Sequence, residues 1–380
     1  MDLDFTDEQE MLRDLARGLC SSACALETVR SLEDDPVGYS TDFWAQLGAA
    51  DLIGLTLPEQ FGGSAMTALE AAVVAEELGR GVAPSPHFVS ATLAAGVLLK
   101  AGATEQQQAW LPGIATGKTI LSVAWLEPNG GFGAKGIRTT AVPADDGTDD
   151  FVLDGTKWHS PYASSAERLV VPARTGDGPT DIDLFLVDPT GDGVTLTQMF
   201  SIASDTQYEV KLDGVRMGPE DRIGTGGAGW AAFEATMLEG LVLLAAQAVG
   251  GAQYALDITV QYAKDREQFD KPLGAFQAIS HYLADASTAV NGARTLVYEA
   301  AWALANGRDI SSLAPMAKLF ACQTFRDVTA MGEQVFGGVG FTLEYDIQLY
   351  FRRAKQLQIS WYDDAFLSEL IAVQVLDQPA

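Results

Sequence analysis

The stretch YAKDREQFDKPLGAFQAISHYLADA, residues 262–286, has the pattern of two helices joined by a charged turn. The first helix is expected to end near Arg266 and to leave that side chain exposed. Proline and glycine within residues 272–274 reverse the chain, and a second helix begins at Phe276–Gln277. This stretch therefore predicts a helical hairpin.

The segment before the hairpin has the pattern of one long buried helix. Residues 231–266 contain no proline, and their first half is apolar on every side, which is typical of a helix inside a bundle. The longest uncharged run, residues 240–256, is shorter than the ~20 residues that span a bilayer. We therefore expect a C-terminal helical bundle over residues 226–380 and no membrane segment.

Between residues 121 and 225 the period of the apolar residues changes to two. Short β-branched and aromatic segments alternate with Gly, Asp and Pro turns, namely TILSVAWLE, IRTTAVPA, FVLDGTKWHS, RLVVPAR, DIDLFLVD and TQYEVKLDGVRM. This spacing favours a small antiparallel sandwich or barrel over a doubly wound parallel sheet. The run GTGGAG, residues 224–229, matches a dinucleotide fingerprint, but no βαβ unit surrounds it, so we interpret it as a hinge between domains.

Residues 1–120 have the spacing of helices. Thr6 and Gln9 have the spacing of a capping box, and Met11, Leu12, Leu15 and Leu19 follow at helical intervals. The segment 67–81 repeats this pattern and stops at glycine. The sequence thus predicts an α+β fold that is mostly α, with an N-terminal helical domain (1–120), a middle β domain (121–225) and a C-terminal helical bundle (226–380).

The composition is that of a globular protein, with 47% hydrophobic and 20% charged residues. Its 24 basic and 51 acidic residues give a net charge of −27, which disfavours nucleic acid and anionic membranes because both need clustered Lys and Arg. Cys20 and Cys24 lie one helical turn apart, but no nearby histidine completes a zinc site, so we expect buried thiols and no metal. The few cysteines and the acidic start of the chain predict a cytoplasmic protein.

Several motifs occur in the order known from one enzyme family. Residues 262–277 resemble the acyl-CoA dehydrogenase signature, which reads roughly Y-A-x-x-R-x-Q-F-G-x-P-x-x-x-F-Q. Further pieces agree in order, namely LTLPEQFGGS, AWLEPNGG, LDGTKWH, LDGVRMGPEDRIG and EQVFGGVGFTLEYDIQLYFRRAK. The chain is similar to this family over essentially its whole length, and the family has the same helical, β, helical order.

The resemblance implies an FAD-dependent enzyme that removes the α and β hydrogens of an acyl-CoA thioester. In the family a glutamate takes the α-proton and the flavin takes the β-hydrogen as hydride. Each flavin of the family's tetramers lies between two subunits. One subunit holds the ring and the base, and its neighbour contacts the pyrophosphate and adenine. The family also implies an electron-transfer flavoprotein as the acceptor.

The residues that would contact a neighbour's flavin are of the kinds that the family uses. Arg266 offers a permanent planar cation to pyrophosphate oxygens, and Gln268 can donate beside it. Glycine near the end of a later helix allows close approach of the adenosine end. The resemblance assigns cofactor contacts to Arg266, Gln268, Phe269, Phe276, Gln277, Gln334, Gly337 and Gly338.

The residues that would hold the chain's own flavin ring depart from the family pattern. Leu126 replaces a threonine that donates to the ring, and Phe132–Gly133 replace a Ser-Asp pair. His159 falls at an aromatic position and Pro161 at a hydroxyl position. Leucine and proline have no side-chain donor. A one-residue shift onto Trp158 would restore the aromatic ring but not both donors.

Both positions at which the family carries its catalytic glutamate hold other residues. Alignment from FRRAKQLQI places Trp361 at the first, and an indole cannot abstract a proton. The alternative position, on the long helix, is Gly240. Glu239 is one residue away, about 100° round the helix. Asp363 and Asp364 are displaced by two and three residues, and we interpret them as solvated or capping acids.

We therefore expect a subunit that has kept the neighbour's half of the flavin site and lost the catalytic half. Such a chain would act with a catalytic acyl-CoA dehydrogenase-like partner in an α2β2 heterotetramer, as in bacterial steroid side-chain degradation. Two alternatives remain open. One is a homotetrameric dehydrogenase with a displaced base, such as Asp363 or Glu239, and the other is a non-enzymatic scaffold that binds no flavin.

Overall fold

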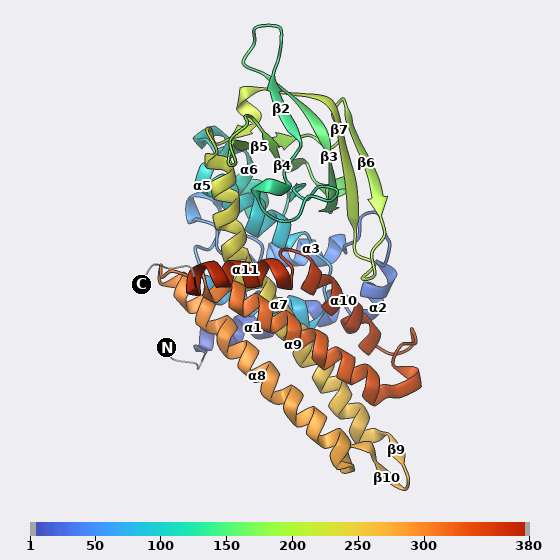
Figure 1. The fold of residues 1–380 in the computed structure, drawn as a ribbon. Coiled ribbons are helices and arrows are strands. Elements are labelled where there is room, and N and C mark those ends of the chain that lie inside the picture. The colour runs from blue at the N-terminus through green and yellow to red at the C-terminus, as the bar shows by residue number, and fades with distance from the viewer. Residues whose placement is uncertain (1–4, 377–380) are drawn as a thin grey trace. The chain divides into compact units, whose positions relative to one another are not determined.

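The computed structural model describes residues 5–376, in which helices come first, strands second and helices last (Figure 1). The N-terminal helices are α1 (Asp7–Ala23), α2 (Leu26–Ser31), α3 (Thr41–Ala49), α4 (Ala68–Arg80), α5 (Ala95–Ala101) and α6 (Thr104–Ala115). The strands of the middle region are β1 (Leu121–Val123), β2 (Thr140–Pro143), β3 (Phe151–Pro161), β4 (Arg168–Arg174), β5 (Ile182–Val187), β6 (Val194–Met199), β7 (Gln207–Met217) and β8 (Arg222–Ile223). The C-terminal elements are α7 (Ala228–Asp265), β9 (Glu267–Gln268), β10 (Lys271–Pro272), α8 (Gln277–Ala305), α9 (Leu313–Phe336), α10 (Ile347–Ile359) and α11 (Asp364–Val375). The predicted fold class is confirmed.

Contacts between residues divide the chain into two units that do not follow the order of the sequence. The first unit contains the chain up to Arg30, Thr67–Ala83 and everything from Leu241 onward. The second contains Ser31–Met66 and Pro84–Gly240. Helices α1 and α4 therefore belong with the C-terminal helices, and the sheet belongs with α3, α5 and α6.

The second unit is built around one eight-stranded sheet. Its strand order is β6-β7-β3-β2-β4-β5-β8, and β1 pairs in parallel with β4. Most neighbouring strands are antiparallel. Leu153, Phe185 and Val210 lie in its core without exposed surface. Strand β6 was not among the predicted strands, because its short run VTLTQM is half polar.

The first unit is a bundle in which each helix packs on the next. Helix α1 packs on α4, α4 on α8, α8 on α9, and α9 on α10 and α11. Figure 1 shows α8 and α9 as long neighbouring helices. Helices α4 and α7 cross at glycine: a Cβ on Gly250 would lie 1.8 Å from the carbonyl oxygen of Glu76. Only glycine therefore permits this close crossing.

The predicted capping boxes are present at two helix starts. The backbone N–H of Gln9 donates to Thr6 Oγ1 at 3.3 Å, and the backbone N–H of Thr6 donates to Gln9 Oε1 at 3.1 Å. Helix α4 begins with the same arrangement of Thr67 and Glu70. These side chains satisfy backbone donors that have no partner inside the helix.

The prediction that the large apolar residues of α1 form its packed face is only partly correct. Met11 and Leu15 are 64% and 44% exposed, and the buried residues are Ala16 and Cys20. The fully buried positions of the helix are therefore small residues, while Leu12 and Leu19 are partly buried.

Helix α7 is long and apolar enough to cross a membrane by length and composition alone. Of its most apolar window, 72% is buried inside the protein, which is the environment of a core helix. The helix is longer than the uncharged run in its sequence, because it continues through polar residues at both ends.

Candidate functional site

The charged turn after α7 is a small hairpin that carries several of the predicted cofactor residues. Strands β9 and β10 pair antiparallel with Gln268 opposite Lys271, and Phe269 and Asp270 turn the chain with positive φ. The side chain of Phe269 is 87% exposed and meets the ring of Phe276 edge-on at 6.2 Å. The predicted helical hairpin is thus present, and its tip projects an aromatic side chain into solvent.

Arg266 lies at the base of this hairpin with an exposed side chain. Its backbone N–H donates to the carbonyl oxygen of Tyr262 at 2.8 Å, and its carbonyl oxygen accepts from the N–H of Leu273 at 2.8 Å. Within residues 5–376 no carboxylate pairs with its guanidinium group. A permanent cation that its own chain does not neutralise is available to an anionic ligand.

The second group of predicted cofactor residues lines a pocket of about 580 Å³ at the end of α9, called the α9 pocket below. Gly337 has a φ of +67°, and a Cβ added to it or to Gly338 would meet nothing within 4 Å. Tyr262 stacks on Phe336 with ring centroids 4.1 Å apart, so this glycine turn and the Arg266 hairpin lie at one end of the first unit. The lining residues are Ala330, Glu333, Gln334, Gly337, Gly338, Phe341, Gln348, Phe351 and Arg352.

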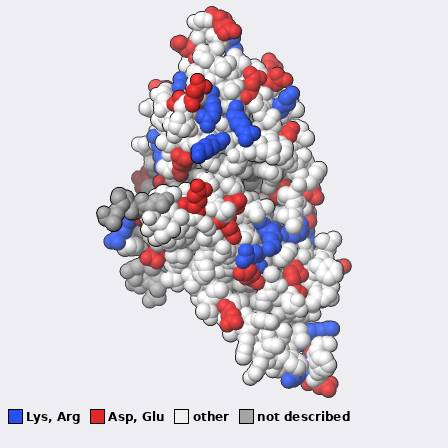
Figure 2. Space-filling model, in the orientation of Figure 1, with Lys and Arg blue, Asp and Glu red and all other residues white. Residues whose placement is uncertain are grey.

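Helix α10 contributes polar residues to the α9 pocket that sequence reasoning missed. Arg352 Nε donates to Gln348 Oε1 at 2.8 Å. Figure 2 shows Lys and Arg side chains gathered over the region where α10 runs in Figure 1. Helix α10 itself contributes Arg352, Arg353 and Lys355 and contains no acidic residue. A basic helix in a chain with a net charge of −27 is the signal that could have identified this surface.

In the second unit, Glu127 anchors the loop that follows β1. It is 9% exposed and accepts from the backbone N–H groups of Arg138 at 2.8 Å and Thr139 at 3.0 Å. Thr139 Oγ1 donates to it at 2.8 Å, and Lys157 Nζ donates at 2.5 Å. The loop that contains Leu126 is therefore held on β3 by a buried carboxylate.

Lys157 is the partner of this carboxylate and has no exposed surface. Burial lowers the pKa of Lys157 to about 8, although Glu127 opposes the shift. Burial alone would raise the pKa of Glu127, but Lys157 and Thr139 bring it below its ordinary value. An ionised carboxylate saturated with donors is a structural group and not a free base.

The positions expected to touch a flavin ring lie on the same loop and strand. The pairing of β3 with β7 shifts register between Lys157 and Ser160, and His159 has a φ of +54° there. His159 is exposed, with its Nδ1 2.7 Å from Gln207 Oε1. Trp158 is half-buried and donates from Nε1 to Glu209 at 2.7 Å. Because a bulge changes the face that successive residues take, the alternation of the sequence could not decide between Trp158 and His159.

The turn at Trp361 in the first unit is held by a buried lysine. Trp361 and Tyr362 have φ values of +55° and +74°, which bulky residues rarely adopt. Lys318 has no exposed surface, and its Nζ donates to the carbonyl oxygens of Leu357, Ser360 and Tyr362 at 3.1, 2.9 and 2.7 Å. The turn therefore has a defined geometry, and it carries an indole at the position where we predicted the family's base to fall.

The two aspartates after Trp361 have structural partners. Asp363 caps α11, and its Oδ1 accepts from the backbone N–H of Phe366 at 2.9 Å. Asp364 accepts from Gln358 at 2.8 Å and from Gln323 at 3.3 Å. The geometry agrees with the interpretation of Asp363 as a capping acid, whereas Asp364 is partly buried and its Oδ1 has no hydrogen-bond partner in the described part of the chain.

The predicted alternative position of the base, in the second unit, is crowded. A Cβ on Gly240 would lie 3.1 Å from the ring of Phe88, so that ring would have to shift by a few tenths of an ångström. Glu239 points elsewhere and forms an ion pair with Lys100 at 2.8 Å on a partly exposed surface. Neither residue has the environment of a catalytic base.

We expect the substitutions Asp363→Asn and Asp364→Asn to leave the turnover of the active assembly nearly unchanged, because no proton passes through either side chain. Asparagine also caps helices well, so the fold should persist. A positioned general base contributes ~10²–10⁴-fold. Steady-state turnover of the folded, yellow assembly measures the effect. A loss of that size in either variant would show that the substituted aspartate is the catalytic base, which would contradict our prediction.

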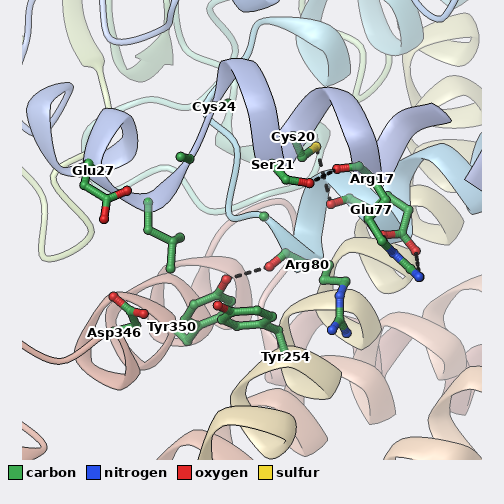
Figure 3. A pocket seen from close by; sticks show the side chains of 13 residues that line it. Arg17, Cys20, Ser21, Cys24, Glu27, Glu77, Arg80, Tyr254, Asp346 and Tyr350 are labelled. Carbon is green, nitrogen blue, oxygen red and sulfur yellow. Dashed lines mark hydrogen bonds and ion pairs between the residues drawn. The ribbon is translucent and has the colours of Figure 1, made fainter. Parts of the chain in front are cut away.

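A second pocket, of about 340 Å³, lies among α1, α4, α7 and α10 in the first unit (Figure 3). Arg17 and Glu77 face each other there in a two-bond ion pair at 2.9 and 2.7 Å. Burial raises the pKa of Cys20 to about 12 and that of Cys24 to about 11, so both line the pocket as neutral thiols. Among residues 5–376 no group of three His, Cys, Asp or Glu side chains is placed to hold a metal ion.

Three family models match almost the whole chain. The N-terminal domain of acyl-CoA dehydrogenase matches residues 6–118, the middle domain residues 122–215 and the C-terminal domain residues 227–372. The chain is also 31% identical to a probable acyl-CoA dehydrogenase, YngJ, of Bacillus subtilis, over 99% of this chain and 100% of YngJ.

Two solved structures are similar over nearly their full lengths. A chain of the ChsE4-ChsE5 complex from Mycobacterium tuberculosis is 27% identical to this chain, with a TM-score of 0.89. The match covers 100% of this chain and 100% of that chain. A variant of the Tcur3481-Tcur3483 steroid ACAD has a TM-score of 0.86 and 31% identity and covers 98% of both chains. Together with the family models and YngJ, these likenesses show that the chain belongs to the acyl-CoA dehydrogenase family, whose members are FAD-dependent flavoproteins that dehydrogenate acyl-CoA thioesters.

Proposed function

We propose that this chain is the subunit of a hetero-oligomeric acyl-CoA dehydrogenase that completes the flavin site of a catalytic partner chain. The observation that carries the proposal is the hairpin after α7, which holds Arg266 without an acid partner among the described residues and Phe269 with 87% of its side chain exposed. A permanent cation and an aromatic ring on one exposed hairpin are both available to contact another molecule.

The residues at this end of the first unit fit the pyrophosphate and adenosine part of FAD. Arg266 offers a planar cation to the pyrophosphate, and Gln334 adds an amide. The open space beside Gly337 and Gly338 allows the backbone to approach the nucleotide closely. When bound, FAD supplies the electron acceptor of the reaction, while these residues bind and orient its nucleotide end.

The residues at the ring position do not fit a flavin of the chain's own. Leu126 and Pro161 offer no side-chain donor, and exposed His159 lies against Gln207. Trp361 and Gly240 occupy the two positions of the family base, and neither can accept a proton. In the proposed assembly, an α2β2 heterotetramer, the partner chain therefore supplies the base and the ring contacts.

Two other functions fit the geometry less well. A homotetramer with a displaced base needs a free carboxylate, but Asp363 caps α11 and Glu239 pairs with Lys100. A scaffold that binds no flavin would not explain the exposed cation of Arg266 or the open space beside Gly337 and Gly338. The geometry therefore favours the hetero-oligomer over both.

The substrate that we propose is an acyl-CoA thioester with a bulky, steroid-type acyl group. One similar structure, the Tcur3481-Tcur3483 steroid ACAD, supports this choice of substrate, and the ChsE4-ChsE5 complex supports an assembly of two kinds of chain. An electron-transfer flavoprotein would then take electrons from the assembly, as is usual for the family. The substrate and the acceptor both act at the catalytic partner's site in this scheme.

The flavin content of the purified chain tests the proposal. We expect the chain made alone to be poor in FAD, because Leu126, His159 and Pro161 remove contacts with the ring, and the chain co-purified with its catalytic partner to be yellow. Absorption of the released flavin against protein concentration gives the ratio. A full equivalent of FAD per chain in the isolated protein would replace the hetero-oligomer by the homotetramer, and no flavin in either preparation would favour the scaffold.

A further inference from the structure

The pocket in Figure 3, called the α1 pocket below, has no part in the proposed function. It lies wholly within the first unit, and its volume of about 340 Å³ is large enough for a small molecule. Its walls include Cys20 and Cys24 on α1, Leu26 on α2 and Tyr350 on α10. The raised pKa values of Cys20 and Cys24 keep both thiols neutral, so these walls suit an apolar group.

The cations that line the α1 pocket already have acid partners. Arg17 pairs with Glu77 at 2.7 Å. Arg80 pairs with Asp257 at 2.8 Å, and its guanidinium lies over the ring of Tyr254, 5.2 Å from the centroid. Because an acid neutralises each guanidinium, neither Arg17 nor Arg80 offers a free positive charge to an anionic ligand.

The other end of the α1 pocket is negatively charged. Figure 3 shows Glu27 and Asp346 at this end, away from the Arg17–Glu77 pair. Asp346 pairs with Arg30 through Oδ1, and its second carboxylate oxygen accepts no hydrogen bond from the described residues. Glu27 forms no ion pair within residues 5–376. Glu27 is therefore the charged lining residue of the described chain that has no counter-charge, and the pocket favours a cation.

A tyrosine hydroxyl lies near both of these acids. Tyr254 is partly buried, and its ring stacks on that of Tyr350 with centroids 4.9 Å apart. Its hydroxyl forms no hydrogen bond with another residue of the described chain. Burial raises the pKa of Tyr254, and the charges of Asp346 and Glu27 raise it further. The two carboxylates and this hydroxyl are thus three acceptors at one end of the pocket.

We propose that the α1 pocket binds a small organic ammonium ion, whose charged group donates to Glu27, Asp346 and the hydroxyl of Tyr254. An ammonium group has three donors and no acceptor, which matches these three oxygens. The apolar body of the ligand contacts Cys24 and Leu26. An anion would instead face the unpaired carboxylate of Glu27. The proposal goes beyond the proposed function and does not depend on it, because no flavin residue lines this pocket.

Binding of three phenyl compounds to the full chain tests the proposal. They are phenethylammonium, phenethyl alcohol and phenylacetate, which share an aromatic body and differ in charge. We expect the ammonium to bind about threefold or more tightly than the alcohol, a ratio between those of an exposed ion pair and a charge-assisted hydrogen bond. Phenylacetate should bind most weakly, because its carboxylate meets Glu27. Ligand-observed NMR titration measures all three dissociation constants.

Three variants locate the binding. Glu27→Gln keeps the shape of the side chain and should make the ammonium and the alcohol bind about equally. Glu344→Gln is the matched control, because it removes an exposed acid two positions before Asp346 that does not line the pocket, and the preference for the ammonium should persist. Ala25→Phe fills the pocket and should abolish binding of all three compounds. Circular dichroism shows whether each variant is folded.

Equal affinity for phenethylammonium and phenethyl alcohol in the unchanged protein would overturn the proposal, as would a preference that survives Glu27→Gln. Failure of all three compounds to bind would also overturn it. Undiminished binding to a folded Ala25→Phe variant would place the ligand outside the α1 pocket. If Ala25→Phe does not fold, the comparison of Glu27→Gln with Glu344→Gln still decides the question.

Discussion

Replacing Lys157 by methionine should lower the free energy of unfolding by about 3–5 kcal/mol, which is typical of removing one partner of a buried ion pair. Lys157 has no exposed surface and donates to Glu127 at 2.5 Å and to the carbonyl oxygen of Pro172 at 2.7 Å. Methionine fills a similar volume, so the loss comes from the uncompensated charge of Glu127 and not from a cavity. Denaturant unfolding followed by circular dichroism measures the change.

Two further variants test this explanation. Lys211→Met removes an exposed lysine of the same sheet, whose contact with Asp213 is 3.4 Å long, and should change the free energy of unfolding by no more than about 0.5 kcal/mol. Adding Glu127→Gln to Lys157→Met removes the buried charge and keeps an acceptor for the backbone. That double variant should recover about 1 kcal/mol or more of the loss. Equal unfolding midpoints for Lys157→Met and Lys211→Met would show that the buried pair contributes nothing.

The order of helices and strands could be predicted because its causes are local. Thr6 and Thr67 begin helices through side chains that act within three residues. The alternation of β3 is likewise visible within one segment. Strand β6 was not predicted, because its run is short and half polar and shows little alternation of apolar and polar residues. The strand forms by pairing with β7. The bulge at His159 is also set by pairing between strands and is invisible in the alternation.

The site was less predictable, because its polar groups find partners far along the chain. Lysine is usually exposed, so neither Lys157 nor Lys318 could be recognised as buried from its neighbours. The partner of Lys157 is 30 positions away, and the carbonyl partners of Lys318 are 39 to 44 positions away. The hairpin with Arg266 was predictable because turn residues adjoin it. The roles assigned to its side chains in cofactor binding remain predictions.

In the assembled enzyme, Arg266→Ala should weaken retention of FAD by about tenfold to a hundredfold, the range expected for loss of a charge-assisted hydrogen bond to pyrophosphate. The guanidinium has no acid partner among the described residues of its own chain, so its removal leaves no unpaired carboxylate and should not unfold the hairpin. The backbone bonds of Arg266 with Tyr262 and Leu273 do not involve the side chain and persist in alanine. The expected effect is therefore on the cofactor and not on stability.

Dialysis of the co-purified assembly, followed by measurement of bound flavin, gives the loss of FAD with time. Lys264→Ala is the matched control, because it removes an exposed basic residue two positions earlier on α7 and should leave FAD occupancy unchanged. Arg266→Lys should give an intermediate result, since lysine keeps the charge but not the planar pair of donors. Occupancy that is the same in Arg266→Ala as in Lys264→Ala would exclude Arg266 from the pyrophosphate. The exposed hairpin would then be explained by subunit contact alone, with Phe269 and not the cation as its functional side chain.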